Sequence, residues 1–254
     1  MLVMKPWKWV VLAFVTYLIL LVAYLPAAHV VSYVQKQNPK LPVSIGTVEG
    51  TLWSGRVDRI MTNGVLLNNF RWELSAWALL IGQAKVEVNG GKIRQSDQAY
   101  IDGQVSASLF NSQKLSAKDL KVLLPAKAVI AQVPLPVPVT ADGRFRIDVQ
   151  SFDFNKSCKL LSGTGRWLKG TVSGPTGVID FGNYEANLSC DNDKFVVQVL
   201  PDNKLNLDAM VVVGMDGKYD LSGKFKPDES MPREVHMAAQ SFGRADAQGF
   251  RQLR

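Results

Sequence analysis

The sequence predicts a mainly β protein in which a single N-terminal transmembrane helix precedes an elongated antiparallel β-sheet domain. Three patterns lead to this prediction: an uncharged apolar run at residues 9–25, apolar residues with a period of two after residue 40, and repeated Asn-Gly or Asp-Gly dipeptides. Alternation is typical of half-buried strands, and these dipeptides are typical of tight hairpin turns. With 254 residues, 47% of them hydrophobic, the chain is long enough to bury a sizeable core.

The apolar run WVVLAFVTYLILLVAYL, residues 9–25, has no charge and only Thr16 as a clearly polar residue. A membrane-spanning helix needs about 17–25 such residues, so we expect this run to cross a bilayer, with Pro26 inside its end. Lys5 and Lys8 place the short N-terminal tail on the cytoplasmic side. A cleaved signal peptide is the alternative, but no Ala-x-Ala pattern stands at a suitable place. The predicted segments are a cytoplasmic tail at 1–8, a transmembrane anchor at 9–27, a linker at 28–40 and a periplasmic β domain at 41–254.

The β domain shows its pattern most clearly in KYDLSGKFK, where Tyr219, Leu221 and Phe225 alternate with polar residues. Because positive φ is easily reached at such dipeptides, hairpin turns are expected at Asn63-Gly64, Asn89-Gly90, Asp142-Gly143 and Asp216-Gly217. Residues 75–83 predict a short helix or a connecting turn.

The segment 115–139 departs from the alternation. Its first part has apolar residues at helical spacing, with Ser116 as a possible N-cap, and its proline-spaced end must be extended. The proline-rich end is a plausible boundary, which would divide the β domain into halves at 41–138 and 139–254.

Cys158 and Cys190 are the only cysteines, and both fall in the predicted exported part. An even count in an oxidising compartment predicts a disulfide, which would stabilise the fold by about 3–4 kcal/mol on the chain-entropy model. Two free buried thiols are the alternative. A metal site is not expected, because no Cys-x-x-Cys is present and the only histidines are His29 and His236.

Trp53 stands among glycines in EGTLWSGRV, and a partial echo with Trp167 follows in SGTGRWLKGTV. Glycine within a strand marks a bulge or a close approach of another group. Gly50 and Gly55 would therefore let the indole of Trp53 lie across the strand surface as a packing wedge at a bend of the sheet. The alternative is that Trp53 lines a groove or a partner-binding edge.

The motifs of common enzymes are missing: the sequence has no Gly-x-Ser-x-Gly, no phosphate-binding glycine loop and no His-Glu-x-x-His. We therefore expect a non-enzymatic protein without a cofactor. The formal net charge is +7, but lysines and arginines are dispersed rather than clustered with aromatic residues, so no nucleic-acid partner is expected.

Several motifs taken in order are more specific than any one of them. After the basic, apolar N-terminus come LPVSIGTVEGTLWSGRV, FRWELSAWALLIGQAKVEV, LSGTGRWLKGTV, GVIDFGNYEANLSC, DGKYDLSGKFKPDESMP and FGRADAQGF. This set resembles the type II secretion system protein N family of Gram-negative bacteria. The resemblance implies a single-pass inner-membrane accessory subunit, mostly periplasmic, that works with other inner-membrane subunits of the machine. The candidate structural or interaction residues that it carries are Gly50, Trp53, Gly55, Trp72, Trp77, Trp167 and Tyr219, with the Cys158–Cys190 pair.

A second interpretation follows from the strand pattern. Amphipathic strands behind one N-terminal anchor resemble the AsmA-like periplasmic proteins, which hold a lipid in an open apolar β groove. The chain would then be a periplasmic lipid or hydrophobic-ligand binding and transport protein. The two interpretations differ in whether the apolar strand faces form a closed core or line an open trough.

Overall fold

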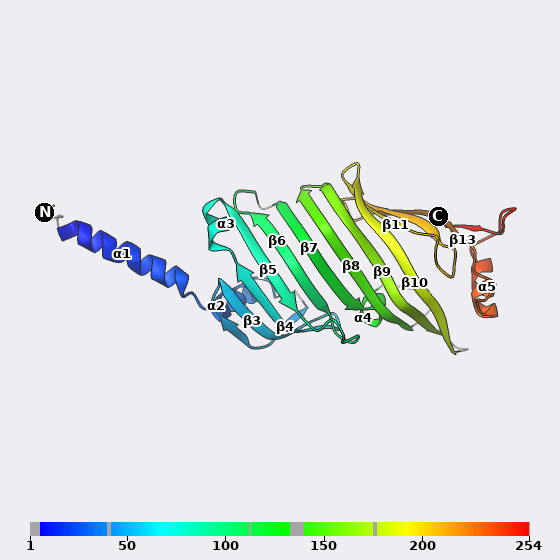
Figure 1. The fold of residues 1–254 in the computed structure, drawn as a ribbon, viewed down its shortest axis with the longest axis horizontal. Helices are drawn as coiled ribbons and strands as arrows, with labels where there is room; N and C mark the ends of the chain where they lie inside the picture. Colours follow the sequence, from blue (N-terminus) through cyan, green and yellow to red (C-terminus); the bar gives the residue numbers. More distant parts are fainter. Residues whose placement is uncertain (1–5, 40–41, 112, 133–139, 175–176, 254) are drawn as a thin grey trace.

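The protein is built on one large antiparallel sheet of 14 strands, from which a helix projects at the N-terminal end (Figure 1). The structure, a computed structural model, describes residues 6–39, 42–111, 113–132, 140–174 and 177–253. The helices are α1 (Pro6–Ala23), α2 (Ala27–Gln37), α3 (Ala76–Leu80), α4 (Ala126–Ile130) and α5 (Arg233–Gln240). The strands are β1 (Val43–Ile45), β2 (Val48–Gly50), β3 (Ser54–Thr62), β4 (Val65–Leu74), β5 (Gln83–Gly90), β6 (Tyr100–Ser108), β7 (Lys114–Pro125), β8 (Thr140–Asn155), β9 (Cys158–Gly174), β10 (Gly177–Asp191), β11 (Lys194–Val199), β12 (Asp208–Val213), β13 (Tyr219–Phe225) and β14 (Arg251–Leu253).

The order of strands in the sheet follows the order in the chain from β3 to β14, with β1 and β2 both paired to β3. The mainly β prediction is therefore confirmed. Two of the expected hairpin turns are found, since Asn63-Gly64 joins β3 to β4 and Asp216-Gly217 lies between β12 and β13. The other two expectations are wrong. Asn89-Gly90 is the end of β5, and Asp142-Gly143 lies inside β8, where Gly143 has φ +99° at a register shift.

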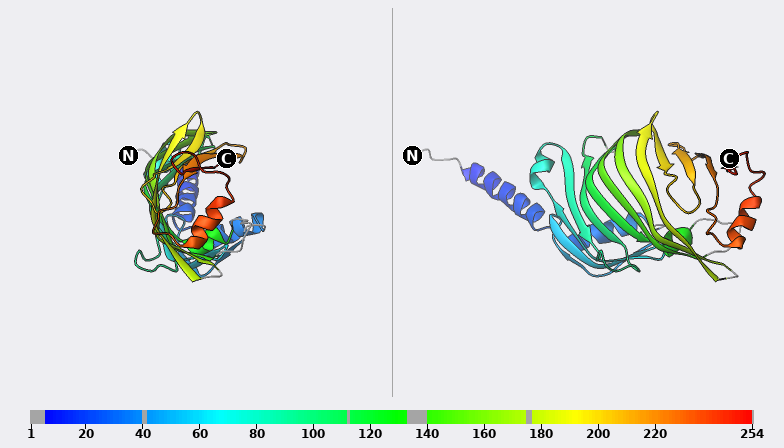
Figure 2. Two further views of the ribbon diagram at one scale, coloured as in Figure 1. Left: turned by 90° about the vertical axis from the view of Figure 1, so that its right-hand side faces the viewer. Right: turned by 45° about the vertical axis from the view of Figure 1, so that its right-hand side comes forward.

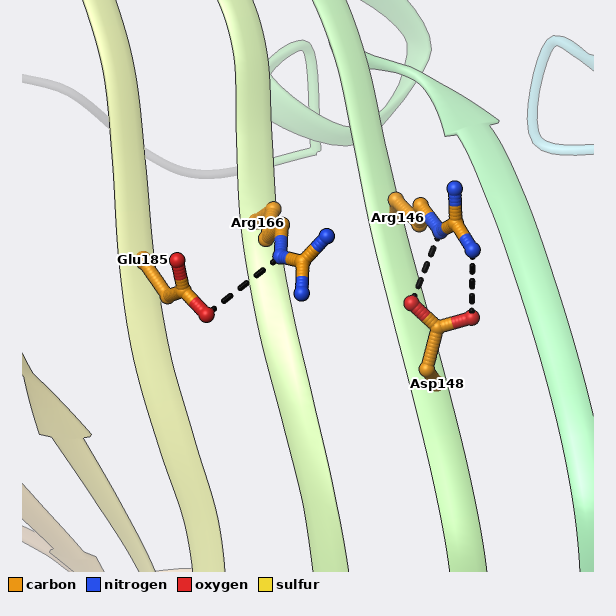
Figure 3. A network of polar contacts seen from close by, with 4 residues as sticks. All are labelled: Arg146, Asp148, Arg166 and Glu185. Carbon is orange, nitrogen blue, oxygen red and sulfur yellow. Dashed lines mark hydrogen bonds and ion pairs between the residues drawn. The ribbon is translucent and has the colours of Figure 1, made fainter.

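The sheet is curved, and its two faces differ in chemistry. Figure 2 shows α4 and α5 on the concave side of the sheet. Strand residues alternate between the faces, so Phe145 and Ile147 face the concave side, while Arg146 and Asp148 face the convex side. On that outer face Arg146 forms an ion pair with Asp148 at 2.7 Å, beside a second pair on the two following strands (Figure 3).

The concave face is largely open. Among the described residues no second sheet packs on it, and the accessible surface of the chain is 17091 Å², against about 11,000 Å² expected for a compact protein of this length. The small buried core consists mainly of alanines, with a few larger residues such as Val57, Leu123 and Phe225. A single curved layer with a projecting helix explains both facts.

The N-terminal segment differs from the prediction. Helix α1 ends at Ala23 and does not continue through Pro26, because the residue before a proline is driven out of the helical region. The segment 28–40, predicted as a linker, is instead mostly occupied by α2. Within the described part of the chain, no helix combines the length and the apolar character that a membrane crossing requires. The transmembrane helix predicted at 9–27 is therefore not found.

The segment 115–139 begins as a strand and not as a helix. One series of its apolar residues falls at 115, 117, 120, 122 and 124, with Leu123 on the other face, and Asp119, with φ +50°, forms a bulge where the register shifts. One extra residue in a strand turns a period of two into an apparently helical spacing. Ser116 is consequently a strand residue, not an N-cap, while the short helix expected within 75–83 is confirmed as α3.

The boundary expected near residue 139 lies among residues 133–139, outside the described residues. Strands β7 and β8, on its two sides, are directly paired along most of their length, from Lys114↔Asn155 to Pro125↔Arg144. The residues 41–138 and 139–254 thus contribute to the same sheet, and their division into halves stays a prediction about domains.

Candidate functional site

Trp53 holds the end of α1 against the sheet. It lies in the short connection between β2 and β3, and its indole N–H donates to the carbonyl oxygen of Val22, at the end of the helix, at 2.9 Å. Two neighbouring backbone contacts join the same segments: the amide of Leu52 donates to the carbonyl of Leu25 at 2.9 Å, and Pro26 bridges to Thr51. The carbonyls at a helix end have no partner within the helix. The Val22 carbonyl also accepts from the amide of Leu25 at 3.4 Å, so the indole N–H gives it the shorter of its two hydrogen bonds.

Glycines shape this connection. Gly50 has φ +93°, and a Cβ there would lie 2.5 Å from the carbonyl oxygen of Ser54, so only glycine fits. A Cβ on Gly55 would collide with the ring of Trp72, which stacks on Phe70 and donates to the carbonyl of Leu52 at 3.1 Å. The wedge predicted for Trp53 is therefore formed by Trp72, and Trp53 itself contacts the helix.

The junction is surrounded by apolar surface. Leu18, Ile19, Val22 and Ala23 of α1 form an apolar hollow with Trp53 and with Ala76 of α3. The apolar side chains of α1 are exposed around the whole helix. Both α1 and α3 lie at the N-terminal end of the sheet (Figure 1).

An exposed patch lies beside this junction. Trp77, at 81% exposure, and Phe110, at 88%, are its most exposed members. The segments are adjacent because the amide of Leu109 donates to the carbonyl of Gly82 at 2.9 Å. We call this surface the α3 patch, and it consists of Trp77, Leu80, Ile81, Leu109 and Phe110.

Trp167 lines a separate apolar cavity of about 570 Å³ on the concave face. Its ring lies against Phe145, Phe181 and Tyr184, with ring centroids 5.7 to 6.3 Å apart. The indole N–H donates to the carbonyl of Asp142 at 3.0 Å, and the ring occupies the space that a side chain at Gly170 would need. The other apolar lining residues are Leu124, Val129, Ile147, Gly165, Val172, Ala186, Leu188, Val197, Val199, Leu205 and Leu207.

Two polar groups on this face are buried without a partner. The hydroxyl of Tyr184 has no well-formed hydrogen bond, and burial raises the pKa of Tyr184, although the nearby backbone of Leu205 offsets part of the effect. The Nε of Arg251 is also buried and has no hydrogen-bond partner in the described residues. Arg251 is directly opposite Phe225 in the pairing of β13 and β14.

The predicted Cys158–Cys190 disulfide is confirmed, with Cα atoms 5.6 Å apart and Cys158 only 2% exposed. Three phenylalanines cluster around the paired strand ends: Phe152, Phe154 and Phe195. Tyr219 is 73% exposed on β13, so it joins neither the junction nor the cavity. The predicted site residues thus fall into separate places, with Gly50, Trp53, Gly55 and Trp72 together at the junction.

Comparison with known proteins decides the family. The family model described as "Type II secretion system (T2SS), protein N" matches residues 42–254. A protein of Aeromonas hydrophila named "Type II secretion system protein N" is 30% identical over 92% of this chain and 91% of its own length. The chain belongs to the type II secretion system protein N family. A protein of the same name from Vibrio cholerae is 27% identical over 80% of this chain and 79% of its own length. One from Klebsiella pneumoniae is 25% identical over 81% of this chain and 79% of its own length. No solved structure matches.

The family match covers the whole sheet of this type II secretion system protein N, including the junction loop and the cavity. Within the described residues no cluster of three or more histidine, cysteine, aspartate or glutamate side chains could hold a metal ion. The arrangement offers apolar contact surfaces at two places, the α3 patch and the cavity.

Sequence reasoning missed Phe181, Tyr184 and Arg251. The motif GVIDFGNYEANLSC contains the first two, but Gly182 and Asn183 interrupt the alternation at register shifts, so their common face was hidden. Arg251 lies in a basic C-terminal stretch that resembles a frayed end. The short pattern of Phe250 and Arg251 before Gln252 and Leu253 gave no signal of a paired strand.

Proposed function

We propose that the chain is a non-enzymatic accessory subunit of the type II secretion system, located at the inner membrane with its sheet in the periplasm. It would assist the export of folded periplasmic proteins across the outer membrane. The family assignment supports the secretion role. The observation that carries the location is the junction at Trp53, which fixes an exposed apolar helix at one end of the sheet.

The helix α1 has the surface of a segment that lies in apolar surroundings, since a helix with apolar side chains on every side is typical of the membrane or of a buried core. None of the described elements covers it except at the junction. We therefore assign α1 the role of holding the chain at the inner membrane. The hydrogen bond from Trp53 to Val22 would then help to set the orientation of the sheet relative to that membrane.

The α3 patch is the surface that we assign to contacts with other inner-membrane subunits. Monomeric proteins rarely expose clustered aromatic and aliphatic side chains, and such clusters mark interaction sites. Its position beside α1 supports this assignment, because those subunits would be met where α1 holds the chain. Tyr219, exposed at a distance from the junction, provides a matched aromatic position for comparison.

The experiment places a photo-crosslinking amino acid at Trp77 or at Tyr219 in the native host and identifies the adducts by mass spectrometry. We expect adducts with inner-membrane secretion subunits at Trp77 and few or none at Tyr219. Trp77→Asp should reduce the secreted cargo in the medium several-fold and leave it in the periplasm, whereas Tyr219→Asp should secrete normally. Normal secretion by cells that lack the whole chain would refute the proposed function.

The alternative function, a periplasmic lipid or hydrophobic-ligand carrier of AsmA-like type, is not favoured by the comparisons. The relatives are named for secretion, and the likeness to AsmA-like proteins stays a prediction. The cavity on the concave face nevertheless needs an occupant in its own right.

A further inference from the structure

The cavity on the concave face is apolar, accessible and built from distant parts of the chain. Its lining comes from β7 to β11, from α4 and from the connection before β12. Its volume of about 570 Å³ lies within the range of about 300–1,000 Å³ typical of ligand pockets. An open apolar surface of this extent is unfavourable in water, so it favours a ligand.

A protein segment suits this cavity poorly. Strands β8, β9, β10 and β11 are paired on both sides, so their backbone groups are not free to bind an extended peptide lying across the face. Such a peptide would bury its own N–H and C=O groups without partners. A helix about 10 Å wide that rises about 1.5 Å per residue takes about 120 Å³ per residue, so only about five residues would fit. A hydrocarbon chain has neither limitation.

Arg251 is a cation that shares this apolar face. Val199, which lines the cavity, is opposite Ala209, which is opposite Gly223 and then Leu253, so these four residues share a face. Arg251 is two residues before Leu253 on β14 and therefore points to the same side.

A series of backbone contacts also connects Arg251 to the cavity. It pairs with Phe225, and the amide of the next residue, Lys226, donates to the carbonyl of Leu205 at 2.8 Å. Leu205 lines the cavity. The buried, unpartnered Nε of Arg251 calls for an acceptor, and guanidinium groups bind phosphate oxygens particularly well. Arg144 also has buried nitrogens without partners, but it precedes Phe145 in the strand and so faces the convex side.

We propose that the cavity binds an acyl chain of an anionic phospholipid, whose phosphate pairs with Arg251 at the C-terminal end of the sheet. The apolar lining selects the hydrocarbon, and the arginine selects the charge. This inference goes beyond the proposed secretion role, because it concerns a ligand of the folded chain and is tested on the purified protein.

The first experiment fills the cavity. Gly165 lines it, and a Cβ there would have only Leu188 nearby, at 3.9 Å, so Gly165→Phe places a ring in the cavity without a backbone collision. Gly174→Phe, on the same strand with nothing within 4 Å, is the matched control. Full-length proteins in detergent are incubated with phosphatidylglycerol and phosphatidylcholine of identical chains, separated from excess lipid, and analysed by mass spectrometry. We expect Gly165→Phe to lose most retained phosphatidylglycerol and Gly174→Phe to retain it.

The second experiment removes the cation. Arg251→Gln should lower the preference for phosphatidylglycerol over phosphatidylcholine by about tenfold, as expected for one charge-assisted hydrogen bond. Arg244→Gln, an exposed arginine outside the strands, should keep the preference. Circular dichroism and thermal unfolding confirm that each variant is folded.

Three results would overturn the proposal. Equal lipid retention by Gly165→Phe and the wild-type protein would show that lipid binds elsewhere, for instance around α1. Equal retention of the two lipids by the wild-type protein would exclude a role for Arg251. A protein segment or a second copy of the chain found in the cavity by crosslinking from Tyr184 would identify a different occupant.

Discussion

The hydrogen bond from Trp53 to Val22 can be tested by removing only the donor. Trp53→Phe keeps an aromatic ring in the apolar hollow but has no N–H to donate to the Val22 carbonyl. A hydrogen bond of this kind contributes about 1 kcal/mol, so local opening of the junction should become about fivefold more frequent. The amide of Leu52, which donates to the carbonyl of Leu25 beside it, reports that opening.

Hydrogen–deuterium exchange measures the effect directly. The Leu52 amide should exchange about fivefold faster in Trp53→Phe than in the wild-type protein. Trp77→Phe is the control, since Trp77 is 81% exposed and makes none of the described hydrogen bonds. An unchanged exchange rate of the Leu52 amide would refute a stabilising hydrogen bond from Trp53 to Val22. An equal increase in both variants would indicate that the fold is destabilised in general.

Two further predictions concern the paired strands β9 and β10 and the turn that follows them. Replacing Cys158 and Cys190 together by alanine should lower the free energy of unfolding by about 3–4 kcal/mol, measured by urea denaturation, and an unchanged midpoint would contradict the entropic argument. Hydrogen bonds from Lys159 and Ser157 lower the pKa of Asp193 in the folded state, so its stabilising contribution is present above pH of about 4 and is lost as the pH falls through the lowered pKa. Asp193→Asn should therefore be less stable than the wild-type protein at pH 7 but equally stable in strong acid, and a difference that persists in acid would exclude this ion pair as its cause.

The strands and the disulfide could be predicted from the sequence because both leave local signals. A strand with one apolar face must alternate, as β13 does from Tyr219 to Phe225. A lone pair of cysteines in a chain that is predicted to be exported is typical of a disulfide. The short helix α3 was also accessible, since Ser75 accepts a hydrogen bond from the amide of Ala78 as an N-cap.

The wrong or missed sequence predictions have physical causes that act over longer distances or at single residues. The bulge at Asp119 shifts the alternation by one residue, so a strand imitates helical spacing. The role of Trp53 depends on a backbone carbonyl 31 residues earlier, and no pattern of side chains encodes such a partner. Arg251 becomes distinctive only when the sheet places it on the same face as Val199 and Leu205.

The consecutive order of strands bears on how the chain is made. Because β3 to β14 each pair with the strand just before them, no strand waits for a partner from a distant part of the chain. Contacts close in sequence have a small loop-closure cost and favour rapid folding. A chain delivered from its N-terminus can therefore add one hairpin after another to a growing edge. The bond between Cys158, at the start of β9, and Cys190, near the end of β10, can form only after both strands have been delivered. Folding would thus proceed in the direction of synthesis, with the junction at Trp53 as its first tertiary contact.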